Sequence, residues 1–152
     1  MGRTARGVRG IRLEEGDWVA GVVLVEDDKQ LITITENGFG KRSEFEEFAC
    51  HNRGGKGVCC HNVNEKTGCL ASIASVSESD DLMLMTSEGT MIRMAVCEIP
   101  VYKRSAGGVI VMRTSGEAKV ATFTVVANED DVETEGGETP VEASAETPVV
   151  TE

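Results

Sequence analysis

Aromatic residues are scarce in this chain of 152 residues, where Phe, Trp and Tyr together make up 4% of the composition. Aromatic platforms on which single-stranded bases could stack are therefore not expected. No run approaches the roughly 20 apolar residues that a membrane-spanning helix needs. No apolar core follows the charged N-terminal residues, as it would in a secretion signal. We expect a soluble protein that is made and kept in the cytoplasm.

The cysteine content and spacing also argue against a disulfide framework and against a metal site. Five cysteines, an odd number in a chain with no export signal, indicate reduced thiols. The residues that raise the question of zinc are Cys50, His51, Cys59, Cys60, His61 and Cys69. They contain no pair of cysteines at the spacing, about two to four residues, that zinc sites typically use. We expect no metal, and we expect Cys59, Cys60 and Cys69 to be buried thiols that pack as small apolar side chains.

Positive charge is outnumbered, with 15 Lys and Arg against 26 Asp and Glu and a net charge of −11. Residues 127–152 hold nine of the acids and no base, so residues 1–126 carry 17 acids against 15 bases, a net charge of −2. The C-terminal stretch also contains Pro140 and Pro148 and lacks aromatic residues. Because it cannot bury enough apolar surface to offset the entropy of ordering, we expect 127–152 to be a disordered acidic tail.

The rest of the chain repeats with a period of 50 or 51 residues. The aligned segments are 7–11 with 57–61 and 108–112, 17–25 with 68–76 and 118–126, and 31–38 with 82–89. They are short and rich in Val, Ile, Leu and Thr, which is the composition of β-strands. Asn37-Gly38 supplies the positive φ of a tight hairpin, and Glu88-Gly89 stands at the same register. No stretch has the spacing of a long amphipathic helix.

We therefore predict an all-β fold of propeller-like pinwheel blades, with about four strands in each unit of about 50 residues. The units run approximately over 1–50, 51–101 and 102–126, and the third lacks the hairpin of the other two. The domain at 1–126 thus holds about two and a half blades. An incomplete ring exposes its sheet edges, and we expect the missing strands to come from residues that precede Met1.

Basic residues recur at matching positions of the units. The matched sets are Arg3, Arg53 and Arg104; Arg42 and Arg93; Arg6 and Lys56; and Arg12 and Arg113. In a circular stack, equal register means equal radial position, so these charges should form a stripe along one rim. A curved positive stripe on a nearly neutral body suits a bent polyanion such as duplex DNA.

The connections between units favour the same partner. Residues 53–57 read Arg-Gly-Gly-Lys-Gly, and the equivalent junctions are 103–108 and 2–7. Glycine allows backbone shapes closed to other residues and lets main-chain N–H groups approach a phosphate. Solvated turns are the alternative for any one of these loops, but three basic, Gly-rich junctions in register favour phosphate contact.

Three motifs together resemble the family of C-terminal domains of the DNA gyrase A subunit. They are residues 7–13 (GVRGIRL), 36–42 (ENGFGKR) and 53–57 (RGGKG), and the resemblance runs in order over about residues 1–126. It implies a six-bladed β-pinwheel that bends DNA around its basic outer rim, in an enzyme that introduces negative supercoils with ATP. The family's signature box, Gln-Arg-Arg-Gly-Gly-Lys-Gly, lies in the first blade. Here His51 and Asn52 replace its first two residues, so this chain resembles later blades.

The resemblance also implies partners, a location and a division of labour. The partners are double-stranded DNA, the remaining blades and N-terminal domain of the gyrase A subunit, and the gyrase B subunit in an A2B2 assembly, in the bacterial cytoplasm and associated with the nucleoid. The chain is no enzyme by itself, because the family's strand-cleaving tyrosine belongs to the N-terminal region. Tyr102 is expected to pack or to touch the rim. No cofactor is expected in this chain, since ATP and Mg²⁺ bind elsewhere in the holoenzyme.

The predicted phosphate contacts, supporting charges included, are Arg3, Arg6, Arg9, Arg12, Lys41, Arg42, Arg53, Lys56, Arg93, Lys103, Arg104 and Arg113. The glycines at which the backbone is expected to approach DNA are Gly54, Gly55 and Gly57. The acidic tail either solubilises the protein or competes with DNA for the basic rim, and we favour competition as a hypothesis. Two other interpretations stay open: the C-terminal domain of the topoisomerase IV A-type chain, and a propeller-like scaffold that binds protein and whose bases only solvate the rim.

Overall fold

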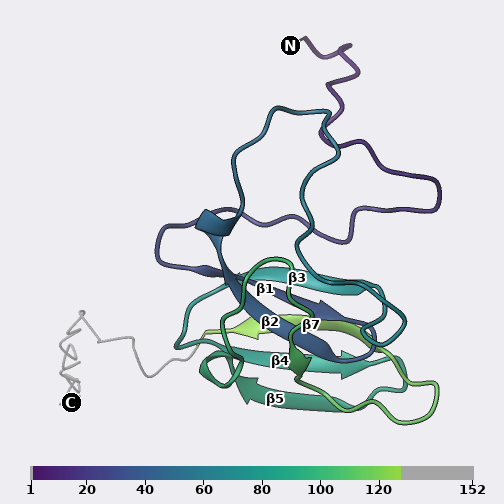
Figure 1. The fold of residues 1–152 in the computed structure, drawn as a ribbon, viewed down its shortest axis with the longest axis vertical. Helices are drawn as coiled ribbons and strands as arrows, with labels where there is room; N and C mark the ends of the chain where they lie inside the picture. Colours follow the sequence, from purple (N-terminus) through teal and green to yellow (C-terminus); the bar gives the residue numbers. More distant parts are fainter. Residues whose placement is uncertain (1, 128–152) are drawn as a thin grey trace, which may run out of the picture.

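The computed structural model describes residues 2–127, and nearly all of its regular structure is β (Figure 1). The strands in this part of the chain are β1 (Gln30–Thr35), β2 (Phe39–Glu44), β3 (Leu70–Val76), β4 (Asp81–Thr86), β5 (Met91–Ala95), β6 (Val109–Ile110) and β7 (Val120–Val126). Two 3-10 helices, η1 (Phe45–Glu47) and η2 (Val96–Glu98), follow β2 and β5. No helix within residues 2–127 has the length and apolar character to cross a membrane. Residues 128–152, nearly all of the predicted acidic tail, lie outside the described residues.

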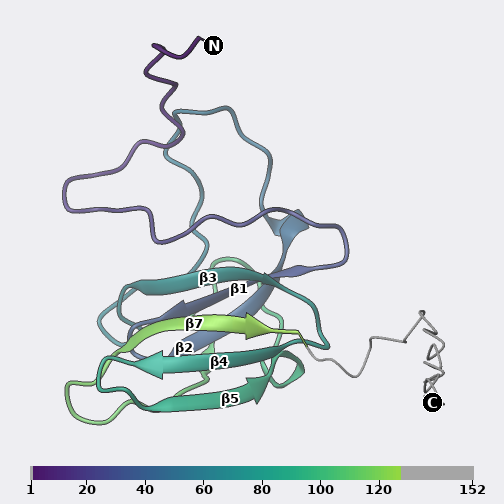
Figure 2. The same cartoon turned by 180° about the vertical axis from the view of Figure 1, so that it is seen from behind.

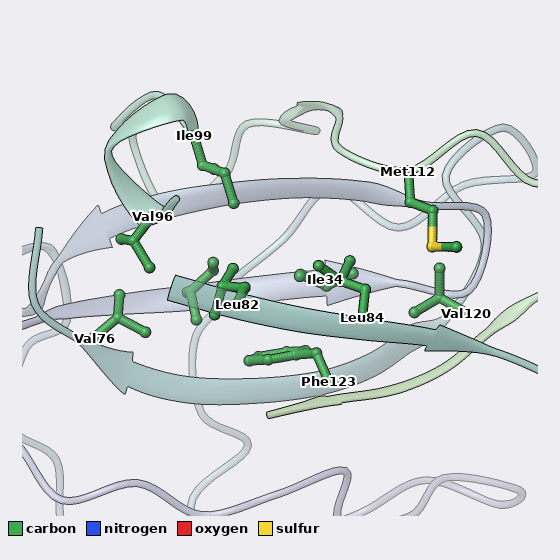
Figure 3. Packing of buried hydrophobic residues seen from close by; sticks show 10 residues of the cluster. Ile34, Val76, Leu82, Leu84, Val96, Ile99, Met112, Val120 and Phe123 are labelled. Carbon is green, nitrogen blue, oxygen red and sulfur yellow. The ribbon is translucent and has the colours of Figure 1, made fainter. Parts of the chain in front are cut away.

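The strands form two antiparallel sheets that share one core. The first sheet has the order β3-β1-β2-β6, and the second has the order β5-β4-β7. Because successive residues of a strand point to opposite faces, Ile32 and Ile34 of β1 present one apolar face, and Leu82 and Leu84 of β4 present another. These four side chains are fully buried, and Phe123 of β7 packs with them. Figure 3 shows the cluster filling the space between the strands.

The tandem repeat is visible in the strand pairing. Gln30 of β1 lies opposite Glu44 of β2, and 51 residues later Asp81 of β4 lies opposite Ala95 of β5. β3 pairs with β1 and β7 pairs with β4, each with a register shift at the last residue of the hairpin strand. The same pairing in two copies confirms the predicted propeller-like, all-β fold class.

Glycine occupies both predicted hairpin turns in the left-handed conformation. Gly38 has a φ of +79° and Gly89 has a φ of +85°. Their amides donate to the carbonyls of Thr35 at 2.9 Å and Thr86 at 3.0 Å, respectively. The surroundings differ, because a Cβ added at Gly38 would overlap the carbonyl oxygen of Met112, whereas a Cβ at Gly89 would meet nothing within 4 Å.

Each sheet is completed by a later repeat. The first sheet contains the β1–β2 hairpin of the first repeat, β3 of the second repeat and β6 of the third. The second sheet contains the β4–β5 hairpin of the second repeat and β7 of the third. The strands of one sequence repeat therefore do not make up one sheet. The hydrogen bonds of each sheet tie different repeats together instead, and in the first sheet they also join the first repeat to the third.

Three predicted strands, at 7–11, 17–25 and 57–61, are absent from the described residues, and the first of these segments has only an isolated bridge between Ile11 and Gly55. Residues 17–25 align with β3 and β7 but have no regular structure. β3 and β7 each pair with the first strand of the preceding repeat's hairpin, and residues 2–16 contain no such hairpin. The prediction is wrong because backbone groups form a strand only when another strand can pair with them. The side chains of Val22 and Leu24 consequently stay 89% and 79% exposed.

Two long segments without regular structure lie on one side of the molecule. In Figure 1 and in the reverse view of Figure 2, the N-terminal segment, coloured purple, lies beyond the first sheet on the side away from the second sheet. Part of the connection between η1 and β3 extends in the same direction. This arrangement places two of the predicted basic segments next to each other.

Candidate nucleic-acid interface

Two junctions connect the repeats, the first at residues 51–57 and the second at residues 102–108. The first junction packs against the start of the first repeat through backbone hydrogen bonds. The Gly54 amide donates to the Gly10 carbonyl at 2.7 Å, and the Arg12 amide donates to the Gly55 carbonyl at 2.8 Å. The cations of residues 9–12 and of the first junction are therefore brought together.

The second junction packs in the same way one repeat later. It lies against residues 59–62, which align with residues 9–12. The Asn62 amide donates to the Ala106 carbonyl at 3.2 Å, and the Arg104 guanidinium donates to the Cys59 carbonyl at 3.0 Å. Because residues 57–62 continue directly from the first junction, both junctions border one continuous path of chain.

We call the cations along this path the basic strip. Its members are Arg9, Arg12, Arg53, Lys56, Lys103 and Arg104. All are exposed except Arg104, which is half-buried. The ammonium of Lys56 lies 3.7 Å from a carboxylate oxygen of Glu14, and these side chains are 75% and 78% exposed. A pair that is this exposed to solvent contributes little to stability. Lys56 can therefore exchange the Glu14 carboxylate for a phosphate.

The first junction also encloses an open hollow of about 500 Å³. The lining residues are Gly10, Ile11, His51, Asn52, Arg53, Gly55, Lys56 and Gly57. Backbone and cationic side chains thus share one concavity, and an anion can reach both.

The prediction that the backbone of Gly54 approaches DNA needs correction. The N–H of Gly54 already donates to the Gly10 carbonyl and is not available to a phosphate.

The structure corrects the prediction that Lys41 contacts phosphate. Its side chain is fully buried, and its Nζ donates to the carbonyls of Lys103 at 2.7 Å and Arg104 at 2.5 Å. Burial lowers the pKa of Lys41 below its ordinary value. The reason for the difference is topological: β6 pairs only with Phe39 and Gly40 of β2, and the chain leading into the second junction runs alongside the next part of β2, where Val101 forms a parallel bridge with Arg42.

Arg42 is corrected for the same reason. Only 4% of this residue is exposed. Its Nε donates to the Ile99 carbonyl at 2.5 Å, and its Nη1 donates to Gln30 Oε1 at 2.9 Å and lies 3.4 Å from Glu78 Oε1. All sides of the guanidinium are used within the protein, so we leave Arg42 out of the candidate interface.

The remaining predicted cations lie outside the basic strip. Arg3, Arg6 and Arg113 are exposed. Arg93, on the edge strand β5, is also exposed, but its Nε and Nη2 lie 2.7 and 2.6 Å from the same carboxylate oxygen of Asp81. That carboxylate neutralises much of the charge that Arg93 could offer to DNA.

Comparison with known proteins settles the family. The family described as "DNA gyrase C-terminal domain, beta-propeller" matches residues 1–26, 29–77 and 80–127. The chain belongs to this family. The stretch 29–77 contains β1, β2 and β3, which is one hairpin together with the strand that the next repeat adds to it. This one matched stretch therefore coincides with a set of paired strands.

Individual relatives agree with this assignment. The chain is 48% identical over 130 residues to the DNA gyrase A subunit of Aminobacterium colombiense, covering 86% of this chain and 16% of that protein. It is 37% identical over 140 residues to the DNA gyrase A subunit of Escherichia coli, covering 90% of this chain and 16% of that protein. The chain thus spans about one sixth of the length of these relatives.

Solved structures share the fold. A structure of a DNA gyrase A C-terminal domain matches with a TM-score of 0.73 and 25% identity, over 79% of this chain and 41% of that one. The C-terminal domain of DNA topoisomerase IV matches with a TM-score of 0.74 over 82% of this chain and 39% of that one. Its identity is 23%, so this second likeness concerns the fold alone.

His61 is a buried polar residue of this gyrase-family domain whose role the sequence did not reveal. Its Nδ1 lies 2.9 Å from Thr33 Oγ1, and its Nε2 lies 3.2 Å from the Gly107 carbonyl. A carbonyl can only accept, so Nε2 carries the proton and Nδ1 accepts from the Thr33 hydroxyl. Burial, followed by the charge of Lys41, lowers the pKa of His61. The repeat register offered a signal, because Met112 occupies the same position and is buried as well.

The cysteines also differ from the prediction. Cys59 and Cys69 are exposed, and Cys60 is half-buried, with a pKa raised by burial. The predicted burial is wrong for the first two because the chain before β3 is a surface loop. Cys59 Sγ instead donates to the His61 carbonyl at 3.0 Å. Within residues 2–127, no group of three or more His, Cys, Asp or Glu is placed to hold a metal ion.

Proposed function

We propose that this chain is a DNA-binding and DNA-bending portion of the C-terminal domain of a gyrase A protein. The basic strip would hold duplex DNA through its phosphates, so sequence preference would come from bendability rather than from base contacts. The observation that carries the proposal is the pair of backbone-bonded junctions, because the path between them joins the cations of three successive repeats.

The rest of the proposal concerns the longer protein. By similarity to the relatives, the chain would act together with the remaining blades and N-terminal domain of gyrase A and with gyrase B in an A2B2 enzyme of the bacterial cytoplasm. That enzyme would use ATP and Mg²⁺, bound elsewhere, to introduce negative supercoils. This chain would contribute DNA binding and bending and no chemical step.

The residues proposed to contact DNA are chosen mainly from the cations that the structure exposes. It contains the basic strip, with Arg3, Arg6 and Arg113 as flanking contacts. Gly55 and Gly57 of the first junction stay in the set as places of close backbone approach, whereas the carboxylate partner of Arg93 makes that residue a minor contributor. If about six phosphates are engaged, the logarithm of the affinity should fall with the logarithm of the salt concentration at a slope near −5.

A gel shift tests the proposal on a duplex of ~100 base pairs, long enough to bend. The charge-reversed variant Arg53→Glu/Arg104→Glu should lose at least about tenfold in affinity, since each cation neutralises one phosphate. The control variant Lys29→Glu/Lys66→Glu changes the net charge equally at cations outside the basic strip and should lose far less. Equal losses would reject the strip. Absence of binding by the wild-type chain at low salt would favour a protein-binding scaffold instead.

A further inference from the structure

β2 holds the second junction through three successive side chains. The side chains of residues 41–43 all donate hydrogen bonds to backbone carbonyls within residues 99–104. The main chain of Arg42 adds two more bonds, because its N–H donates to the Pro100 carbonyl at 3.1 Å and its carbonyl accepts from the Tyr102 N–H at 2.8 Å. Within residues 99–104, every residue except Val101 is thus bonded to β2, and three of these residues, 102–104, belong to the second junction.

Of the three side chains at residues 41–43, that of Lys41 has the highest energetic cost of burial. A fully buried ammonium is tolerated only when it is hydrogen-bonded, and the carbonyls of Lys103 and Arg104 supply the two bonds that the structure gives it. Bonds from a charged donor are about twice as strong as neutral ones. These two carbonyls belong to the two residues that the second junction contributes to the basic strip. Lys41 therefore fixes the backbone from which both cations project.

His61 holds the same junction a few residues further on. Its Nε2 donates to the Gly107 carbonyl at 3.2 Å, and its Nδ1 accepts from Thr33 of β1 at 2.9 Å. His61 is 2% exposed, so neither bond competes with solvent. The segment between Lys103 and Gly107 is consequently held from beneath at both of its ends by side chains that lie out of reach of a duplex.

The second hairpin is built without this arrangement. Residues 92–94 of β5 stand 51 positions after residues 41–43 and are Ile, Arg and Met. Arg93 pairs with Asp81 of the adjacent strand, and the side chains of Ile92 and Met94 have no hydrogen to donate. Both hairpins nevertheless have the same register. A hairpin of this repeat therefore forms without a lysine at this position, and holding the junction is what distinguishes Lys41.

We propose that Lys41 is a positioning residue for DNA binding and that His61 supports it: together they fix the backbone of residues 103–107, which carries Lys103 and Arg104. Neither residue touches DNA. For its effect on DNA the proposal rests on the proposed function of the basic strip, whereas the fixed conformation of the junction can be measured without DNA.

The first experiment measures that conformation by proteolysis. Trypsin cleaves after Lys103 and Arg104, and the rate follows the fraction of time that the junction is open. In the variant Lys41→Met, we expect the appearance of these cleavage products, followed by mass spectrometry, to be at least about tenfold faster. The control Lys66→Met removes an exposed lysine with the same change in charge and should leave the rate unchanged. An unchanged rate in Lys41→Met would overturn the proposal.

The second experiment separates positioning from direct contact. Lys41→Met should weaken binding to a duplex of ~100 base pairs in the wild-type chain, but it should cause no further loss when Lys103→Ala/Arg104→Ala is already present. Equal losses in both backgrounds would mean that Lys41 acts on DNA by itself, and would overturn positioning. If the junction loosens but no variant and no wild-type chain binds DNA, the basic strip fails as a DNA site while the fixed junction stands.

Folding of the variants is checked by circular dichroism. If Lys41→Met has no cooperative unfolding transition, Lys41→Gln replaces it, because the amide keeps a donor at this position. Lys41→Gln should fold and show intermediate cleavage rates. If this variant is also unfolded, Lys41 is required for the sheet as a whole, and the positioning role is rejected.

Discussion

Gly38 and Gly89 hold the same turn position in successive repeats, and their different surroundings predict different responses to one mutation. Gly89→Ala should cost about 1–2 kcal/mol of unfolding free energy, the penalty for a side chain in the left-handed region. Gly38→Ala should lose a further ~1–3 kcal/mol, because its Cβ overlaps the Met112 carbonyl oxygen and forces the two backbones apart. Urea unfolding followed by circular dichroism measures both.

Gly89→Ala is the matched control, since it has the same conformation without the close backbone. Equal losses for the two variants would mean that the segment carrying Met112 moves away from the turn at no cost. The contact between the third repeat and the first hairpin would then contribute nothing to stability.

His61 gives the protein a predictable dependence on pH. Its pKa is lowered in the folded state, so the unfolded chain binds this proton more readily. The stabilisation from neutral His61 is complete above the unfolded pKa of about 6.5 and is lost as the pH falls through the folded pKa. We expect the urea midpoint to decrease between about pH 7.5 and 5.

Substitution separates this effect from other titrations. His61→Gln should flatten the pH dependence of the urea midpoint over this range, while His51→Gln, at the exposed histidine, should leave it unchanged. A pH profile that is the same in all three proteins would show that another group causes the loss of stability.

At the scale of the strand, residues 17–25 and β3 have aligned sequences but differ in burial. Val76 ends β3 and is 1% exposed, whereas Val25, 51 residues earlier, is 71% exposed. Val76→Asp should cost about 4 kcal/mol or more, because it buries an unpaired carboxylate in the core. Val25→Asp should change stability by no more than about 0.5 kcal/mol. Urea titrations of the two variants test the difference.

The outcome for Val25 also reports on association. If Val25→Asp destabilises the protein as strongly as Val76→Asp does, residues 17–25 must be paired in solution. Size-exclusion chromatography would then show whether a second copy supplies the pairing strand, since an unpaired apolar segment promotes edge-to-edge contacts.

The charge of the whole molecule leads to a prediction about the acidic C-terminus. Deleting residues 127–152 removes nine acids and changes the net charge from −11 to −2. If these acids compete with DNA for the basic strip, the shortened chain should bind duplex DNA more tightly at low salt. The difference should shrink toward 1 M salt, where charges are screened beyond about 3 Å. Equal affinities at low salt would reject competition.

A feature of this molecule could be predicted from the sequence when it depends on residues that are close together along the chain. The period of 50 or 51, the hairpins and their glycine turns follow from alternation and from the conformational needs of a few adjacent residues. The environments of Lys41 and Arg42 could not be predicted in this way. Arg42 has the same repeat register as the exposed Arg93, and what differs is the passage of residues 99–104 alongside β2, where their carbonyls bond the side chains of Lys41 and Arg42.

The sequence by itself determined the repeat, the all-β character and the turns, because these depend on residues that are neighbours along the chain. The tertiary structure decided which strands complete each sheet, which cations reach the surface and that residues 17–25 pair with no strand within residues 2–127. Strand pairing and burial are properties of segments that meet after folding, and the charge of a side chain does not reveal whether a distant carbonyl will satisfy it.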